Sequence, residues 1–159
     1  TGLQTVERSD TISLAALTEE VFCDLDPVAE KHQVRLIQTD GDCTVTGSYI
    51  LLYRAVYNLV ENAIKYNRPS GSVTVSIHTA ESAVLEVTDT GIGISPENQE
   101  KIFDPFYRVD KSRSRAMGGA GLGLALVSEI ARQHNGQVKV TQSSEKGSTI
   151  ALMLPVTLL

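Results

Sequence analysis

The stretch Asn58-Leu-Val-Glu61-Asn62-Ala-Ile-Lys65-Tyr66 combines a polar and an apolar stripe, as in an amphipathic helix. Its polar residues recur every three or four positions and therefore share one helical face; they are Asn58, Glu61, Asn62 and Lys65. The other face is apolar, with Leu51, Leu52, Val56, Leu59, Val60, Ala63 and Ile64. Ser48 is a suitable residue to begin this helix. Such a polar face is either solvated surface or the floor of a binding site.

Two glycine-rich segments favour a binding site over solvated surface as the interpretation of this polar face. Asp89-Thr-Gly91-Ile-Gly93 follows a predicted strand, where a fixed carboxylate can accept a hydrogen bond from the amino group of adenine and the glycines let the backbone approach a flat base. Gly119-Ala-Gly121-Leu-Gly123-Leu124 precedes a predicted helix, and N–H groups at a helix start bind phosphate oxygens. The second segment also resembles a dinucleotide fingerprint, but no βαβ unit surrounds it, so we reject a Rossmann fold.

A third segment, Phe103-Asp-Pro-Phe106-Tyr-Arg108, begins a polar and basic stretch without apolar periodicity. We expect a mobile loop over about residues 104–119. The guanidinium of Arg108 can donate two parallel hydrogen bonds to a phosphate. Lys111, Arg113 and Arg115 are weaker candidates, because charged residues in a loop are usually only solvated.

The rest of the chain alternates predicted helices and strands. A helix over about residues 14–33, capped by Ser13, precedes two short strands at 34–38 and 43–46. Strands are expected at 73–77, 83–87, 137–141 and 148–154, and a further helix at 121–134 ends at Asn135-Gly136. This pattern predicts a two-layer α/β sandwich with helices on one face of a mixed sheet. We interpret residues 1–10 as a polar lead-in.

The composition limits the classes of function. The chain of 159 residues suffices for one domain, and its net charge of −5 argues against binding nucleic acid or an anionic membrane. No segment has the length of a spanning helix and no signal segment begins the chain. Cys23 and Cys43 form no CxxC pair, which predicts reduced thiols in the core.

In their order along the chain, these segments resemble the N, G1, F and G2 boxes of the ATP-binding catalytic domain of bacterial sensor histidine kinases. That domain belongs to the superfamily of DNA gyrase, MutL and the heat-shock chaperone ATPases. The resemblance runs from about Thr11 to about Pro155, and the segment after Phe106 is similar to the phosphate-sensor and osmosensor class. It implies a Bergerat-type fold with a mixed, mostly antiparallel sheet, a domain over residues 11–159, and ATP and Mg²⁺ as cofactors.

The resemblance also implies a role for each motif residue. Asn62, with Asn58 beside it, would bind Mg²⁺, while Asp89 would bind the adenine amino group near the hydroxyl of Thr149. The implied catalytic residues are Glu61, Lys65 and Arg108. The implied nucleotide-binding residues are Asn58, Asn62, Lys65, Tyr66, Asp89, Gly91, Gly93, Ile94, Phe106, Arg108, Gly119, Gly121, Leu122, Gly123, Leu124 and Thr149.

Such a kinase phosphorylates a histidine on a separate dimerisation domain, where an acidic residue and then a proline follow it. None of His32, His78 and His134 has that context, so we expect all three to be structural or exposed. The expected partners are the dimerisation domain and a response regulator. The fragment would be monomeric and cytoplasmic, and the intact protein a homodimer anchored in the bacterial inner membrane. A pseudokinase or docking module and an anti-sigma-type serine kinase are the alternatives, whereas a gyrase-type ATPase would need a longer chain.

Overall fold

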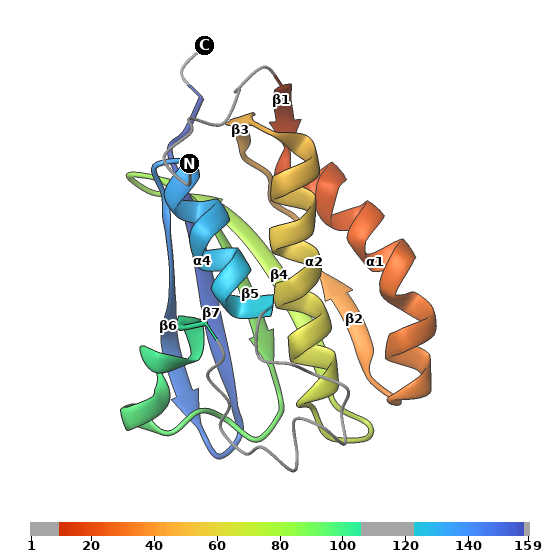
Figure 1. Ribbon diagram of the computed structural model, residues 1–159. Coiled ribbons are helices and arrows are strands. Elements are labelled where there is room, and N and C mark those ends of the chain that lie inside the picture. The colour runs from red at the N-terminus through yellow and green to blue at the C-terminus, as the bar shows by residue number, and fades with distance from the viewer. Residues whose placement is uncertain (1–9, 106–122, 158–159) are drawn as a thin grey trace.

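The computed structural model describes residues 10–105 and 123–157 as two layers, a sheet and a set of helices on one of its faces (Figure 1). The helices are α1 (Leu14–Lys31), α2 (Tyr49–Lys65) and α4 (Gly123–Gln133), with two 3₁₀ turns, η1 (Pro96–Asn98) and η2 (Lys101–Phe103). The strands are β1 (Asp10–Ser13), β2 (Arg35–Gln38), β3 (Thr44–Gly47), β4 (Ser72–Thr79), β5 (Ala83–Asp89), β6 (Gln137–Ser144) and β7 (Gly147–Leu154).

The main sheet has five strands in the order β2-β4-β5-β7-β6. β2 is parallel to β4, and the other neighbours are antiparallel. Side chains alternate along β4, so that Val73, Val75 and Ile77 are buried while their neighbours lie outside the core. The predicted fold class, a mixed and mostly antiparallel sheet covered on one face by helices, is confirmed.

Both predicted helix caps are present. The Ser13 hydroxyl accepts a hydrogen bond from the Ala16 N–H at 3.2 Å, and the Ser48 hydroxyl accepts one from the Leu51 N–H at 3.3 Å. These bonds satisfy amides that the first turn of a helix leaves without a backbone partner. α1 ends two residues earlier than predicted, because Gln33 adopts a positive φ of 58° that a helix cannot continue.

One strand was not predicted. β1 pairs with β3 in a separate two-stranded antiparallel sheet, in which Ile12 lies opposite Val45. Both side chains are buried, and the Asp10 carboxylate accepts a hydrogen bond from the Tyr49 N–H at 2.9 Å at the start of α2. The folded part of the chain therefore includes Asp10, the last residue of the predicted lead-in.

The core lies between the sheet and the helices, and it includes one histidine. The largest fully buried side chains include Leu14, Leu17 and Leu25 of α1, Leu52, Leu59 and Ile64 of α2, and Leu85 and Leu152 of the sheet. His134 is 2% exposed, and its Nε2 accepts a hydrogen bond from the Ser48 N–H at 3.1 Å. Its Nδ1 lies 2.8 Å from the carbonyl oxygen of Ile130 and therefore carries the proton. His134 joins the end of α4 to the start of α2, a structural role as predicted.

The cysteines differ from each other in exposure. Both are free, but only Cys43 is buried, so the prediction of a core thiol at Cys23 is wrong. Cys23 lies two residues beyond the buried Val21, about 200° round the helix, on its outer face. Within residues 10–105 and 123–157, no helix is long and apolar enough to cross a membrane.

Candidate functional site

The C-terminal half of α2 carries the first part of the site. The predicted site residues of α2 and its C-cap are all half-buried, and they are Asn58, Glu61, Asn62, Lys65 and Tyr66. The Lys65 ammonium lies 3.8 Å from the Glu61 carboxylate, one helical turn away, with side chains that are 24% and 27% exposed. Lys65 can therefore exchange this partner for a more strongly charged ligand, because an ion pair in contact with solvent contributes only about 1 kcal/mol.

The start of α4 lies against this face of α2. A Cβ atom on Gly123 would be 3.1 Å from Oδ1 of Asn58, so glycine permits the close approach. The Asn58 amide group donates to the Arg54 carbonyl at 2.8 Å, which leaves its oxygen facing α4. Gly123, a predicted phosphate-binding residue, and Asn58, a predicted metal ligand, are thus brought together. Leu124, the next residue, is 9% exposed and packs in the core.

Asp89 ends β5 and is half-buried with three hydrogen bonds. Its Oδ1 accepts from the Gly91 N–H at 2.8 Å and from the Ser148 N–H at 3.3 Å, and its Oδ2 accepts from the Ser148 hydroxyl at 2.9 Å. Burial raises the pKa of Asp89 above its usual value, although these three bonds act in the opposite direction. A carboxylate offers about four acceptor positions, so about one remains for a ligand.

The hydroxyl beside Asp89 belongs to Ser148 and not to Thr149. In the register of β5 and β7, Asp89 pairs with Ser148, and Thr88 pairs with Thr149. The Thr149 hydroxyl accordingly lies 2.9 Å from that of Thr88. Because successive side chains of a strand point to opposite faces, a shift of one residue moves the hydroxyl to the far face of the sheet. The structure therefore corrects the predicted position of this hydroxyl.

The turn after Asp89 requires its two glycines. A Cβ atom on Gly91 would lie 2.3 Å from the carbonyl oxygen of Tyr66 at the end of α2. Gly93 has a φ of +76°, and a Cβ atom there would lie 1.9 Å from the carbonyl oxygen of Ser144. The half-buried Ile94 follows, and its N–H donates to the Ser143 hydroxyl at 2.6 Å. The predicted residues Gly91, Gly93 and Ile94 are thus packed between α2 and β6.

The remaining predicted site residues lie outside the part of the chain that the structure describes. These residues are Phe106, Arg108, Gly119, Gly121 and Leu122. Phe103, the first residue of the third motif, is described: it ends η2 and packs against the core. The expected loop at residues 104–119 also falls largely outside the described ranges, so it stays a prediction.

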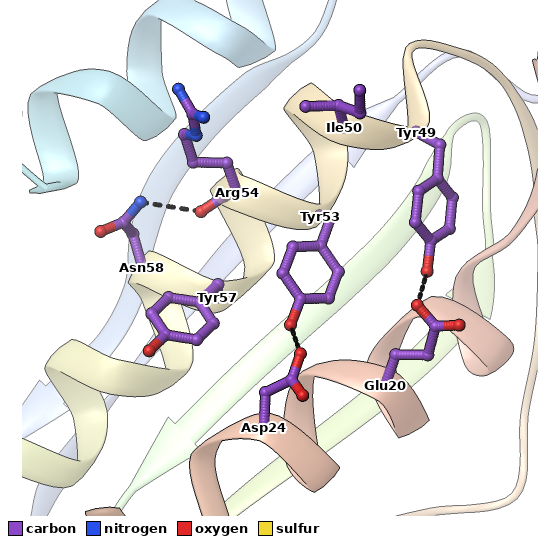
Figure 2. Close-up of a pocket in the computed structure, with 8 residues that line it drawn as sticks. All are labelled: Glu20, Asp24, Tyr49, Ile50, Tyr53, Arg54, Tyr57 and Asn58. Atoms are coloured by element: carbon purple, nitrogen blue, oxygen red, sulfur yellow. Dashed lines mark hydrogen bonds between the residues drawn. The ribbon is translucent and has the colours of Figure 1, made fainter.

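A groove of about 570 Å³ on the outer side of α2 was not predicted (Figure 2). It is lined by Glu20, Asp24, Tyr49, Ile50, Tyr53, Arg54, Tyr57 and Asn58. The hydroxyls of Tyr49 and Tyr53 donate to Glu20 and Asp24 of α1. Burial, followed by the effects of these two carboxylates, raises the pKa of Tyr49 to about 12. The tyrosine spacing of four residues is the sequence signal. Among the described residues that line the groove, only Asn58 is a predicted site residue.

Residues 47–158 match the family of histidine kinase-, DNA gyrase B- and HSP90-like ATPases. The chain belongs to this family. It is 46% identical over 123 residues to the sensor-like histidine kinase SenX3 of Mycobacterium tuberculosis, covering 75% of this chain and 30% of that protein. It is 43% identical over 141 residues to the sensor histidine kinase RppB of Synechocystis, covering 88% of this chain and 31% of that protein.

Solved structures agree with this assignment. The mycobacterial sensor histidine kinase MprB superposes with a TM-score of 0.79 at 27% identity, over 94% of this chain and 99% of that one. Membership of this ATPase family implies that the chain uses a nucleotide. The residues that the structure brings together lie on α2, at the start of α4 and in the turn after β5. The chain spans about a third of the length of the curated relatives named above.

Proposed function

We propose that this chain is the Mg²⁺-ATP-binding kinase domain of a two-component sensor, which presents the γ-phosphate of ATP to a histidine on a separate dimerisation domain. The observation that carries the proposal is the Asp89 carboxylate, held by Gly91 and Ser148 at the turn whose Gly91 packs against the Tyr66 carbonyl at the end of α2. The named relatives, which are sensor histidine kinases, support the choice of histidine kinase within the wider ATPase family.

Asp89 would select adenine. Its remaining acceptor position suits a donor such as the adenine amino group, whereas guanine presents a carbonyl oxygen at the equivalent edge. Two acceptors facing each other in a half-buried site are unfavourable, because neither gains a hydrogen bond in place of water. Gly91 and Gly93 would let the base approach the backbone of the turn. The proposal therefore includes a preference for ATP over GTP.

Asn62 and Asn58 fit a role in holding Mg²⁺. They lie one turn apart on the polar face of α2, and the Asn58 oxygen faces the start of α4. Within the described residues, no three His, Cys, Asp or Glu side chains gather as a metal site, which agrees with an ion that depends on amide oxygens, nucleotide phosphates and water. When bound, the ion would neutralise charge on the phosphates.

Lys65 and Glu61 would act together at the phosphate end. On nucleotide binding, Lys65 would exchange its weak pairing with Glu61 for the phosphate chain, to which it offers three donors. The released Glu61 carboxylate could then accept a proton from the attacking group or orient it. Arg108 is proposed as a second cation on the terminal phosphates. These residues would position the reactants and stabilise charge, which are the main contributions to phosphoryl transfer.

The phosphoacceptor would come from outside this chain. His134 is buried and bonded between α2 and α4, so its ring is not available as a nucleophile. His78 lies on the outer face of the sheet, 3.6 Å from Glu86. We propose a dimerisation domain as the direct partner and a response regulator as the later phosphate acceptor, with an intact protein that is a membrane-anchored homodimer.

Transfer in trans tests the proposal. The chain is incubated with Mg²⁺ and γ-labelled ATP, alone and with a purified dimerisation domain of a related sensor histidine kinase. We expect no label on this chain, and acid-labile, base-stable label on the added domain that disappears in Lys65→Ala. Nucleotide binding without transfer to any dimerisation domain, including the one from the same gene, would instead support a pseudokinase.

A further inference from the structure

We propose that Asn67 and Thr90 are positioning residues that fix the distance between the adenine end and the phosphate end of the nucleotide site. The inference rests on the proposed function, because it concerns how one ligand reaches two separate elements. Neither residue belongs to the predicted site. Asn67 follows the last turn of α2, which carries Lys65, and Thr90 follows Asp89 directly.

Asn67, Thr90 and Ser72 form a closed set of hydrogen bonds. The Thr90 hydroxyl donates to Oδ1 of Asn67 at 2.9 Å and accepts from the Ser72 N–H at 2.9 Å. The Asn67 amide group donates to the Ser72 carbonyl at 2.8 Å. The three residues belong to the segment directly after α2, the turn after β5 and the start of β4. The side-chain amide of Asn67 and the hydroxyl of Thr90 are thus each bonded to a residue of another segment.

A backbone contact also joins the end of α2 to the turn after β5. The Ile92 N–H lies 3.4 Å from the Tyr66 carbonyl oxygen, at the long end of the hydrogen-bond range. This contact is weak, and the hydrogen bonds among Asn67, Thr90 and Ser72 are shorter. Gly71 leaves room for that set: a Cβ atom there would lie 2.2 Å from Oδ1 of Asn67 and 2.5 Å from the Thr90 hydroxyl. One methyl group at Gly71 would therefore separate Asn67 from Thr90.

A fixed spacing between the two ends of the site should affect the affinity for ATP but not the affinity for adenosine. ATP would contact Asp89 through its base and α2 through its phosphates, so a fixed spacing makes the second contact effectively intramolecular. Adenosine lacks phosphates and would engage only the Asp89 turn. Loosening the connection should weaken ATP binding and leave adenosine binding unchanged. A general loss of stability, or damage to the adenine pocket itself, would affect both ligands together.

The test compares ATP and adenosine on matched variants. Thr90→Val removes the hydroxyl at nearly constant volume, and Thr90→Ser keeps it as the control. Gly71→Ala separates Asn67 from Thr90 without removing a polar group. Calorimetry gives the Kd of Mg²⁺-ATP, NMR titration gives the Kd of adenosine, and thermal melting reports the folded state. We expect a Kd for ATP about five- to tenfold higher in Thr90→Val and Gly71→Ala. The Kd for adenosine should change less than about twofold, and Thr90→Ser should match the unmodified chain in both.

Other outcomes overturn the inference. An equal loss of affinity for both ligands would mean that Thr90 only shapes the adenine pocket, and an unchanged Kd for ATP would mean that the spacing does not depend on it. If Gly71→Ala does not fold, Thr90→Val decides, because Thr90 is an exposed residue. Failure of the unmodified chain to bind ATP would overturn the proposed function, and this inference with it.

Discussion

Asp89→Asn is the substitution that separates binding from folding most clearly. The carboxylate uses three of about four acceptor positions within the protein, and the fourth is left for the adenine amino group. An asparagine in the same place has one oxygen with two positions, and the N–H groups of Gly91 and Ser148 would occupy both. Its amide nitrogen would face the Ser148 hydroxyl, which can accept. No acceptor remains for ATP, yet every internal partner is retained.

The expected loss follows from the hydrogen bond that disappears. A hydrogen bond to a charged group contributes about 1.5–3 kcal/mol, and about 1.4 kcal/mol corresponds to a tenfold change in Kd. The Kd for ATP should therefore rise by about 10- to 150-fold. The free energy of unfolding of Asp89→Asn should be equal to or higher than that of the unmodified chain. Because burial raises the pKa of Asp89 above its unfolded value, ionisation of this group reduces the stability of the fold at neutral pH, and asparagine removes that charge.

Calorimetric titration with Mg²⁺-ATP and thermal melting without nucleotide measure the two effects. Glu86→Gln is the matched control, since it neutralises another acid on β5 whose side chain lies on the opposite face, near His78. This control should keep its affinity for ATP. An Asp89→Asn variant that binds ATP within about threefold of the unmodified chain would refute the assignment of Asp89 to adenine. A large fall in melting temperature with parallel loss of binding would make Asp89 a structural residue instead.

Three further predictions concern single contacts. His134→Ala should lower the free energy of unfolding by about 2–4 kcal/mol, because it leaves a cavity and an unpaired Ser48 N–H. Denaturant titration measures this loss, and a value below about 1 kcal/mol would contradict the structural role of His134. Gly93→Ala should lower the free energy of unfolding by about 1–3 kcal/mol, because the added Cβ would meet the Ser144 carbonyl oxygen and alanine disfavours the positive φ at this position. Thermal melting measures this effect, and an unchanged melting temperature would contradict the described conformation of the turn. As the pH falls, affinity for ATP in calorimetry should decrease once Asp89 binds a proton, which burial makes occur at a higher pH than in an ordinary aspartate, whereas the contribution of this group to stability increases. An affinity for ATP that does not change across the acid range in which the fold persists would contradict this.

Local signals in the sequence were sufficient for most of the fold. Ser13 and Ser48 mark the helix starts because their hydroxyls replace missing backbone partners, and alternating apolar residues mark β4 and β5 because one face of each strand is buried. β1 was not predicted, since a four-residue strand with a single buried side chain, Ile12, has too few residues to show a period. Its pairing with β3 depends on contacts distant in sequence.

The roles of the candidate site residues stay predictions, and the structure shows the geometry of those that it describes. Asp89 and the two glycines after it form the turn that the motif suggested, because a side chain at Gly91 or Gly93 would clash with neighbouring carbonyl oxygens. The hydroxyl was misplaced by one residue, from Ser148 to Thr149, since the register between β5 and β7 decides which side chain lies beside Asp89. The Asn67–Thr90 connection joins two motifs 23 positions apart, and its bonds emerge only when α2 and β5 pack together.

Calorimetric titration of the chain with ATP, in Mg²⁺ and in EDTA, and with GTP in Mg²⁺, tests the central claim most directly. The account predicts metal-dependent binding of ATP and at least about tenfold weaker binding of GTP, because Asp89 would lose its donor. A folded chain that binds neither nucleotide, or binds both equally well, would contradict an adenine-specific nucleotide site formed by Asp89 and the polar face of α2.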